Sequence, residues 1–444
     1  MLLAVSFVMF AAYICSDNIF SVEKTLTSPA AQAGYEITDG EYGSLAGAYS
    51  IFNVYLLMLI FGGLILDKTG IRFTGIFSCA LMVAGIALTC GTFYSLRELL
   101  DSGETIATLS FLGDNMRVPV FWAVMGIGLY GVGAEIAGIT VTKVIAKWFI
   151  GYELALAMGL QLALARLGTG LAYGATPVIV SQTSGNVGLA ILIGLILLTI
   201  GFIVFIFYTV FDKKLDRQLQ ESGAEEGGNS PEDEFHFKDI LEVFKNPAFW
   251  MIAFLCLLFY AAVNPFLKYS TGMMVDKFGM SESLAGLFPM ILPMGCIVLT
   301  PLFGNIYDKK GHGADLMIFG AILITAVHLL FASPFITQAW VAVLLMVLLG
   351  VGFAMLPSAM WPSIAKIMPA KLLGTTMALT FYIQNIGFLF VPKAISAIKT
   401  ASNDNYTAMM LFFAGLGMVA LLISIGVKIL DKKKNYGLQI PNIK

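Results

Sequence analysis

The chain has 444 residues, of which 58% are hydrophobic and only 12% are charged, and its formal net charge at pH 7 is −2. Soluble globular domains carry roughly 25% charged residues, so a soluble domain is excluded and most of the chain is predicted to lie away from water. A net charge this close to zero also excludes the basic surface of a nucleic-acid-binding protein. The five cysteines lie in apolar stretches without ligand-like pairing, and no disulfide framework, metal site or other cofactor is predicted.

Apolar stretches long enough to cross a membrane recur along the whole chain. A spanning helix needs about 20 largely apolar residues. Twelve such stretches are predicted, at roughly 1–20, 42–66, 74–93, 119–146, 152–178, 187–211, 247–272, 282–306, 315–333, 338–362, 371–398 and 405–430. The expected fold class is therefore an all-α membrane protein with twelve transmembrane helices. The first stretch has no charged leader and no cleavage site, so it is not predicted to be a signal peptide, and whether a tail precedes it stays open.

The predicted helices divide into two groups of six. We expect an N-terminal bundle at 1–211, a cytoplasmic linker at 212–245, a C-terminal bundle at 246–430 and a tail at 431–444. The linker is rich in Gly, Ser and Glu between Glu221 and Pro231, which predicts a flexible centre. The stretch from Phe235 to Val243 is predicted to form a short surface helix.

A short charged motif ends the second predicted helix and recurs after the eighth. From Gly63 to Gly70, a Gly stands four residues before an Asp, Lys follows the Asp, and another Gly comes three residues after it. The same spacing returns 241 positions later, from Gly304 to Gly311. Repeats at matching positions of two halves are typical of membrane transporters.

This spacing resembles the loop motif of the major facilitator superfamily. The resemblance implies twelve helices in two six-helix pseudo-repeats that rock against each other around a central cavity. It also implies a gating role for the residues of both copies, which are Gly63, Asp67, Lys68, Gly70, Arg72, Asp308 and Lys309.

Lys and Arg divide unequally between the two predicted membrane faces. If Asp67 is cytoplasmic, eighteen of them lie on that face and six on the other. Because cytoplasmic loops are enriched in Lys and Arg, both termini are predicted to be cytoplasmic.

Two ionisable residues lie in the middle of predicted helices. Glu135 is on the fourth helix and Arg166 is on the fifth, and each is about 18–20 Å along its helix from the cytoplasmic face. Such residues mark substrate or ion paths, because an unpartnered charge in the bilayer costs roughly 2.5–3.5 kcal/mol. They are predicted either to bind the two ends of a zwitterion or to form a structural ion pair. Glu135 is also the best candidate for a proton carrier.

Further polar and aromatic residues are predicted to line the same cavity. Tyr260, Asn264 and Lys268 share one face of the seventh helix, where Pro265 is expected to bend or open the helix. Lys268 is predicted either to line the cavity or to reach the outer interface. The remaining candidates are Tyr13 with Asp17, Tyr49 with Asn53, Trp361, and Tyr382 with Asn385.

A longer segment, Lys147–Gly168, resembles the lysosomal dipeptide-transporter branch of the superfamily. That resemblance implies that Glu135, Arg166 and Lys268 bind the backbone of a dipeptide. The chain departs from the branch in lacking a sorting tail and in having only a thin outer glycosylation pattern, at Asn405-Tyr406-Thr407. A bacterial inner membrane is therefore expected rather than a lysosome, and the accessory glycoprotein partner of the branch is doubtful for this chain.

No catalytic constellation and no phosphate-binding glycine loop is visible in the sequence, so neither an enzyme nor a primary pump is predicted. The leading hypothesis is a secondary transporter of short peptides, above all dipeptides. One alternative is a transporter of another small charged solute, such as an organic anion held by Arg166 and Lys268. Another is a membrane sensor or scaffold that transports nothing.

Overall fold

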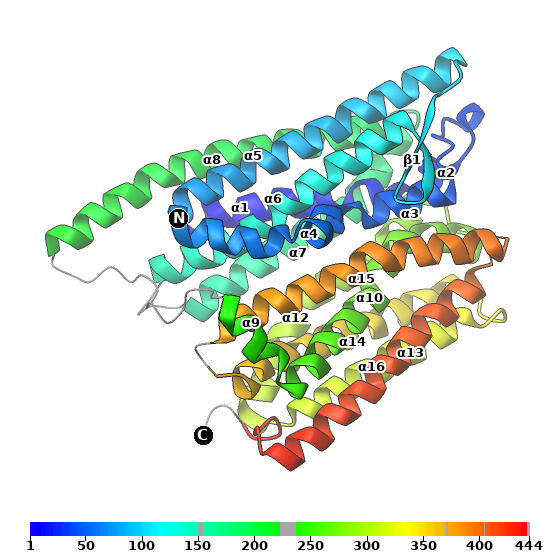
Figure 1. Cartoon of the computed structure of the whole chain (residues 1–444). Coiled ribbons are helices and arrows are strands. Elements are labelled where there is room, and N and C mark those ends of the chain that lie inside the picture. The colour runs from blue at the N-terminus through cyan, green and yellow to red at the C-terminus, as the bar shows by residue number, and fades with distance from the viewer. Residues whose placement is uncertain (150–153, 223–236, 370–371, 404, 442–444) are drawn as a thin grey trace.

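The computed structural model is a bundle of long helices (Figure 1). It describes residues 1–149, 154–222, 237–369, 372–403 and 405–441, apart from the side chains of residues 67, 154–156, 219–222 and 237–239.

Among the described residues, the N-terminal half contains eight α-helices: α1 (Leu2–Asp17), α2 (Glu23–Thr27), α3 (Asp39–Gly47), α4 (Ile51–Tyr55), α5 (Met58–Ser102), α6 (Val118–Phe149), α7 (Leu154–Gln182) and α8 (Val187–Ser222). Short 3-10 turns are η1 (Ile19–Val22), η2 (Ala30–Gln32) and η3 (Ala48–Ser50). An antiparallel hairpin of β1 (Thr108–Phe111) and β2 (Asp114–Arg117) follows α5, with Thr108 opposite Arg117.

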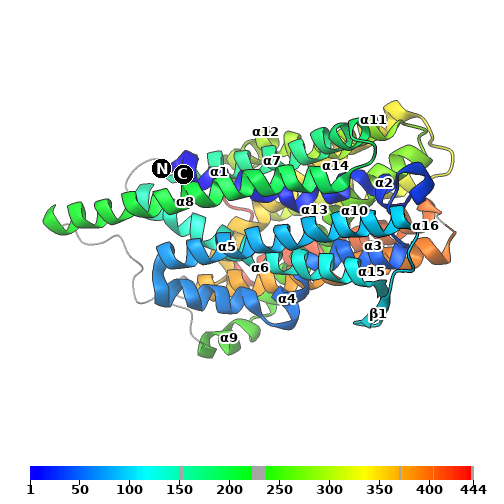
Figure 2. The same cartoon turned by 90° about the horizontal axis from the view of Figure 1, so that it is seen from above.

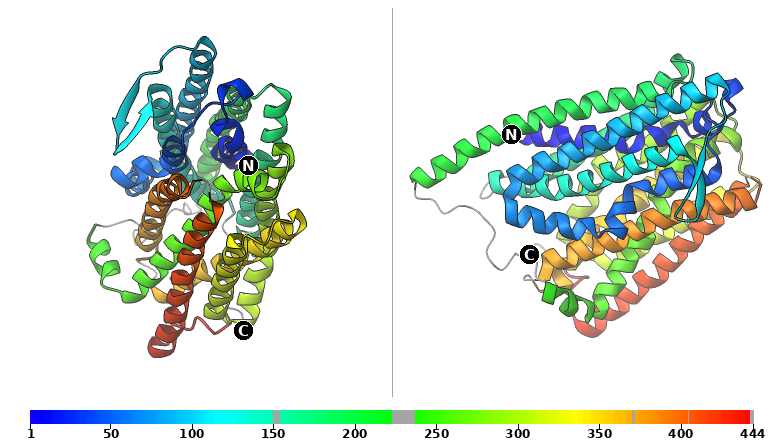
Figure 3. Two further views of the ribbon diagram at one scale, coloured as in Figure 1. Left: turned by 90° about the vertical axis from the view of Figure 1, so that its right-hand side faces the viewer. Right: turned by 45° about the horizontal axis from the view of Figure 1, so that its top comes forward.

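The C-terminal half also contains eight: α9 (Phe237–Phe244), α10 (Pro247–Asp276), α11 (Glu282–Ala285), α12 (Leu287–Lys310), α13 (Gly313–Ala332), α14 (Ala339–Ile367), α15 (Leu373–Ala401) and α16 (Tyr406–Lys434). Viewed along the bundle, the two halves form separate lobes (Figure 3, left).

Within the described residues, ten helices are long and apolar enough to cross a membrane, and a bent pair in α3–α5 gives an eleventh. The 29-residue helix α7 runs between α1 and α12. Counted along the chain with α7, these elements follow the twelve predicted spans. The halves meet along two pairs of helices, α7 with α12 and α3 with α15. These are the fifth, eighth, second and eleventh spans, which occupy equivalent places in the two halves.

Both copies of the repeated motif end at a glycine with a positive φ angle, a conformation that other residues rarely adopt. Gly70 has φ 77° and breaks the long α5, and Gly311 has φ 74° and ends α12. A Cβ atom is strained at positive φ, which explains why the last position of each copy is Gly. The two motif copies lie at one end of the bundle, called the motif end below, together with the N-terminus (Figure 1). The hairpin β1–β2 marks the opposite end.

The second predicted helix is not continuous, which corrects the prediction of one span at 42–66. The 3-10 turn η3 interrupts it, Leu57 adopts a left-handed backbone with φ 53°, and the segments before and after the break are bent by 60°. The stretch from Ala48 to Phe61 contains neither Gly nor Pro, so its sequence carries no local mark of the break.

The sixth span is longer than its prediction, because α8 continues past 211 to Ser222 and projects beyond the other helices (Figure 2). The predicted surface helix is confirmed as α9 over Phe237–Phe244. Most of the predicted flexible centre of the linker, from residue 223 onward, lies outside the described residues.

The two halves are sealed together at the opposite end. Lys399 of α15 lies 3.3 Å from Glu23 and 3.3 Å from Asp39, both in the N-terminal half. Lys24 pairs with Asp276 at 2.5 Å, and the hairpin residue Asp114 pairs with Lys393 at 2.6 Å. Among the described residues, every ion pair between the halves lies at this end.

Close helix packing supports these ion pairs. A Cβ atom on Gly43 would lie 2.6 Å from Ser396 Cβ, and one on Gly47 would lie 2.6 Å from the Leu389 carbonyl oxygen. The two glycines are four residues apart and face α15, so they let α3 and α15 approach closely, as small residues do at helix contacts in membranes. This contact is called the α3–α15 seam below.

Candidate functional site

The candidate site residues come from six helices of both halves, and each is half-buried within its helix. They are Tyr13 on α1, Glu135 on α6, Arg166 on α7, Tyr260, Asn264 and Lys268 on α10, Trp361 on α14 and Tyr382 on α15. Partial exposure at mid-helix is what side chains of a central cavity require, since fully packed residues could not reach a solute.

Arg166 has no hydrogen-bond acceptor and no ion pair among the described residues. Its guanidinium lies 5.7 Å from the centre of the Phe353 ring, across the boundary between the halves. Its electrostatic neighbours include Tyr13, Asp17 and Tyr260. A planar group with five donors is thus left able to bind a carboxylate from outside the protein.

Glu135 is held by neutral partners. Asn385 of α15 donates a hydrogen bond to its Oε1 at 3.3 Å, and Tyr49 is an electrostatic neighbour. No ion pair joins Glu135 to Arg166 in the described structure, so the structural ion pair considered from the sequence does not form in this conformation. Tyr13 interacts electrostatically with both side chains. The acid and the base are therefore close to one shared residue but remain unpaired with each other.

Lys268 turns into the bundle. Its Nζ donates to the Ala46 carbonyl oxygen at 2.6 Å and lies 4.1 Å from the centre of the Phe20 ring. Asp17 is its electrostatic neighbour. Lys268 also lines a small cavity with Cys15, Ser16, Ile19, Phe20, Tyr49, Ile86, Ile127 and Tyr130. A residue of the C-terminal half thereby reaches a cavity of the N-terminal half.

The other candidates differ in whether they form hydrogen bonds within one half or between the two halves. Trp361 donates to the hydroxyl of Tyr260 at 3.1 Å, within the C-terminal half. Tyr382 donates to the Val54 carbonyl oxygen at 3.3 Å, just before the break in the second span. Asn264 makes no side-chain hydrogen bond within the described residues, and α10 continues through Pro265, so the expected opening of that helix is not observed.

Sequence reasoning missed Ser50 and Phe353, which contact Asn385 and Arg166 respectively. Single Ser and Phe residues are common in spanning helices, so neither residue carries a signal of its own. Both contacts are between the two halves, so they follow only from the packing of one half against the other.

The motif end holds a second polar cluster, inside the N-terminal half. Arg72 donates to Asp212 at 2.6 Å and also contacts Asp216, and Lys147 lies 3.1 Å from Asp212 and 2.6 Å from Asp216. Tyr208 and Trp148 add hydrogen bonds to the fully buried Asp212. Arg72 therefore ties the start of the third span to the end of the sixth.

The second motif copy is braced with the charges reversed. Here the acid, Asp315, stands at the start of α13 and pairs at 2.5 Å with Lys428 of α16. Lys68 and Lys309 are exposed, Gly63 has open space around it, and the side chain of Asp67 lies outside the described part. The structure thus gives Arg72, Gly70 and Gly311 clear structural tasks and leaves the gating role of the motif as a prediction.

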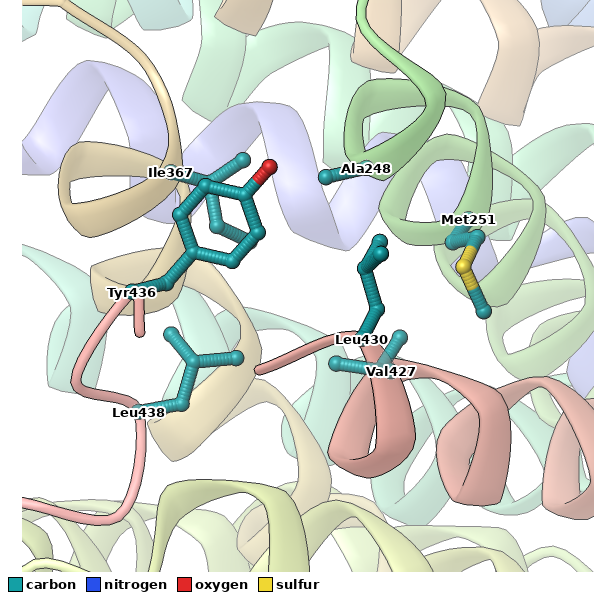
Figure 4. Close-up of a pocket in the computed structure, with 7 residues that line it drawn as sticks. All are labelled: Ala248, Met251, Ile367, Val427, Leu430, Tyr436 and Leu438. Atoms are coloured by element: carbon teal, nitrogen blue, oxygen red, sulfur yellow. The ribbon is translucent and has the colours of Figure 1, made fainter. Parts of the chain in front are cut away.

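The end of the chain folds back over this second copy. The amides of His312 and Gly313 donate to the carbonyl oxygens of Gln439 and Leu438, at 3.1 and 2.9 Å. Lys366 donates to the carbonyl oxygens of Gly437 and Ile440, each at 2.9 Å. Tyr436 and Leu438 line an apolar pocket with Ala248, Met251, Ile367, Val427 and Leu430 (Figure 4).

Residues 3–392 match the sequence profile of the Major Facilitator Superfamily. The lysosomal dipeptide transporter MFSD1 of Homo sapiens is 25% identical over 431 residues, covering 95% of this chain and 83% of that protein. MFSD1 of Danio rerio is 26% identical over 449 residues, covering 99% and 88% of the two chains.

Solved structures share the fold at lower identity. A D-xylose–proton symporter superposes with a TM-score of 0.68 at 16% identity over 95% of both chains. A POT family transporter in complex with a thioalcohol-conjugated peptide gives 0.67 at 12% identity over 97% of this chain and 96% of that one. The predicted twelve-helix membrane fold is confirmed, and the chain belongs to the Major Facilitator Superfamily.

Proposed function

We propose that this member of the superfamily is a secondary transporter of short peptides, above all dipeptides. The MFSD1 relatives, which are named as dipeptide transporters, support this substrate class at 25% identity. The ion pairs that join the described residues of the two halves lie at one end, and they support a mechanism of alternating access in which this seal would open as the motif end closes. The excess of Lys and Arg at the motif end favours that end as the cytoplasmic one.

One observation carries the substrate proposal: among the described residues, Glu135 forms no ion pair with Arg166 or with Lys268. A dipeptide at neutral pH has an ammonium group at one end and a carboxylate at the other. Arg166, whose donors lack acceptors in the described protein, would bind the carboxylate, with Lys268 nearby on α10. Glu135, held by the neutral Asn385, would bind the ammonium group. A simple organic anion would gain nothing from Glu135 and would be repelled by it.

The test compares free and N-acetylated dipeptides on purified protein. A charge-assisted hydrogen bond contributes roughly 1.5–3 kcal/mol, or about ten- to a hundredfold in affinity. Glu135→Gln keeps the shape and removes the charge, so free dialanine should bind weaker by that factor. N-acetyl-dialanine has no ammonium group and should bind the parent poorly, with little further loss in the variant.

Two other results would redirect the assignment. An equal loss for free and acetylated peptide would make Glu135 a structural residue or a proton carrier. Tight binding of simple organic anions with no dipeptide binding would favour the anion transporter. Peptide binding without uptake into proteoliposomes would favour a sensor, because a secondary transporter must move its ligand.

A further inference from the structure

Asn385 joins the candidate substrate site to the break in the second span. It is fully buried on α15 of the C-terminal half. Ser50 of η3 donates to its Oδ1 at 2.6 Å, and its Nδ2 donates to Glu135 Oε1 at 3.3 Å and to the Phe381 carbonyl oxygen at 3.1 Å. One side chain therefore contacts the broken helix and the proposed ammonium-binding acid, both of which belong to the other half.

The orientation of the Asn385 amide follows from its partners. The carbonyl oxygen of Phe381 can only accept a hydrogen bond, so the amide nitrogen must face it. A flipped amide would place Oδ1 against both this carbonyl and the Glu135 carboxylate, which are two acceptors. Asn385 is thus fixed as a donor to Glu135, and this hydrogen bond is strongest when Glu135 is ionised.

We propose that Asn385 is a positioning residue that couples recognition of the substrate's ammonium group to closure of the two halves. The proposal deepens, and rests on, the dipeptide function proposed above. Asn385 and Tyr49 contact the Glu135 carboxylate, and the remaining acceptor positions of its two oxygens would meet the ammonium group. An ammonium group keeps Glu135 ionised, which strengthens the hydrogen bond that holds α15 against α6 and, through Ser50, against the broken second span.

Coupling of this kind works in both directions. If the Asn385 contact favours ammonium binding, ammonium binding must favour the conformation in which the contact exists, by the same factor. That conformation is the one with the α3–α15 seam closed. A peptide without a free amino group would then bind without stabilising the seam.

The first measurement is affinity by calorimetry for dialanine and N-acetyl-dialanine. Asn385→Leu should weaken dialanine about tenfold, a typical coupling between sites, and leave the acetylated peptide nearly unchanged. Ser50→Ala is a milder second variant that keeps Asn385 but removes its anchor. The matched control is Gln384→Met, since Gln384 is the neighbouring buried amide on α15, and its one side-chain hydrogen bond among the described residues comes from Cys256 of its own half, at 3.4 Å.

The second measurement is the distance between the halves at the opposite end. Spin labels at Gly40→Cys and Ala401→Cys are suitable, because both positions are exposed while the native cysteines are buried. Dialanine should shift the parent and the Gln384→Met control toward the short distance, and the Asn385→Leu variant should not respond. In a Glu135→Gln background, Asn385→Leu should have no further effect on dialanine affinity.

Each result decides the matter. The coupling role is overturned if Asn385→Leu behaves like Gln384→Met. It is also overturned if the affinity lost in Asn385→Leu adds fully to the affinity lost in Glu135→Gln. In both cases, normal dialanine binding by the parent would leave the proposed peptide function intact. A parent that binds no dipeptide overturns both proposals. If Asn385→Leu fails to fold, an unchanged dialanine response in Ser50→Ala overturns the coupling role.

Discussion

Arg166 is the side chain on which the proposed selection of dipeptides depends most directly. Its guanidinium carries five donors, makes no hydrogen bond among the described residues and lies 5.7 Å from the centre of the Phe353 ring in the other half. Its neighbours Tyr13 and Tyr260 can hold the guanidinium in place without neutralising it. Lys268 differs from Arg166 because its ammonium group already donates a hydrogen bond to the Ala46 carbonyl oxygen. The two cations are therefore expected to contribute unequally to carboxylate binding.

Arg166→Lys tests this difference, because it keeps the charge and removes the planar fork. Binding of dialanine should weaken by about ten- to a hundredfold, since a lysine cannot form two parallel hydrogen bonds to a carboxylate. Calorimetry on the purified variant measures the effect, with Lys309→Arg as an exposed control at the motif end. An affinity equal to that of the parent would contradict a carboxylate clamp at Arg166.

Among the elements, the sequence predicts continuous, lipid-facing helices best. Spans such as α13 and α16 are apolar over most of their length, and their bounds lie within a few residues of the prediction. The repeated motif also predicts where its turns lie, because a backbone with positive φ requires glycine, and glycine is visible in the sequence. The break in the second span leaves no such mark, since Leu57 and Ser50 are ordinary helical residues in sequence.

The site was predicted as a set of residues and not as a set of contacts. Mid-helix charges are rare, so Glu135 and Arg166 stand out in the sequence. Which side chain faces which depends on how two separately folded bundles meet, and 250 positions separate Glu135 from Asn385. The periodicity of residues within one helix contains no information about how the two halves pack against each other.

The α3–α15 seam allows a test with a matched control on one helix. A side chain at Gly47 would meet backbone 2.6 Å away, whereas Gly40 has nothing within 4 Å. Gly47→Val should therefore disfavour closure at the opposite end by about 1–3 kcal/mol, the usual cost of overpacking. The exposed Ala401 and a second label on the hairpin would report a longer distance between the halves. Gly40→Val should leave this distance unchanged. If the Gly47→Val variant closes as completely as the parent, the α3–α15 seam is not a gate.

At the scale of the whole molecule, the two ends are built on different principles. At the motif end, charges pair within each half, as Arg72 does with Asp212 and Lys428 with Asp315. At the opposite end, Lys24, Lys393 and Lys399 pair across the halves, whereas Arg117 and Glu41 pair within one half. Each half is therefore a stiff unit at one end and attached to its partner at the other, which is the arrangement that rocking motion requires.

Lys399→Met tests the attachment. It leaves Glu23, which is 1% exposed, without its ion-pair partner, and breaking a buried pair costs roughly 3–5 kcal/mol. The variant should populate the conformation open at the opposite end, measured as a longer distance between spin labels at Gly40→Cys and Ala401→Cys, both of which are exposed positions. Adding Glu23→Gln should recover part of the closed population, because it removes the uncompensated charge. If the double variant is as open as Lys399→Met alone, the Glu23–Lys399 pair does not control the seal.

The unsatisfied guanidinium of Arg166 also affects how the protein is handled at the bench. Phosphate, sulfate and citrate present the same paired oxygens as a peptide carboxylate, so they are expected to compete for the same donors. Affinities measured in such buffers would understate the true value, and crystals grown from sulfate would favour an ion over the solute of interest. Buffers of neutral zwitterions bring their own ammonium and acidic groups and would mimic the substrate more closely still. Tris also carries a primary ammonium group near neutral pH and would compete at Glu135, so a buffer with neither a carboxylate-like anion nor a primary ammonium group is the safer medium in which to search for ligands.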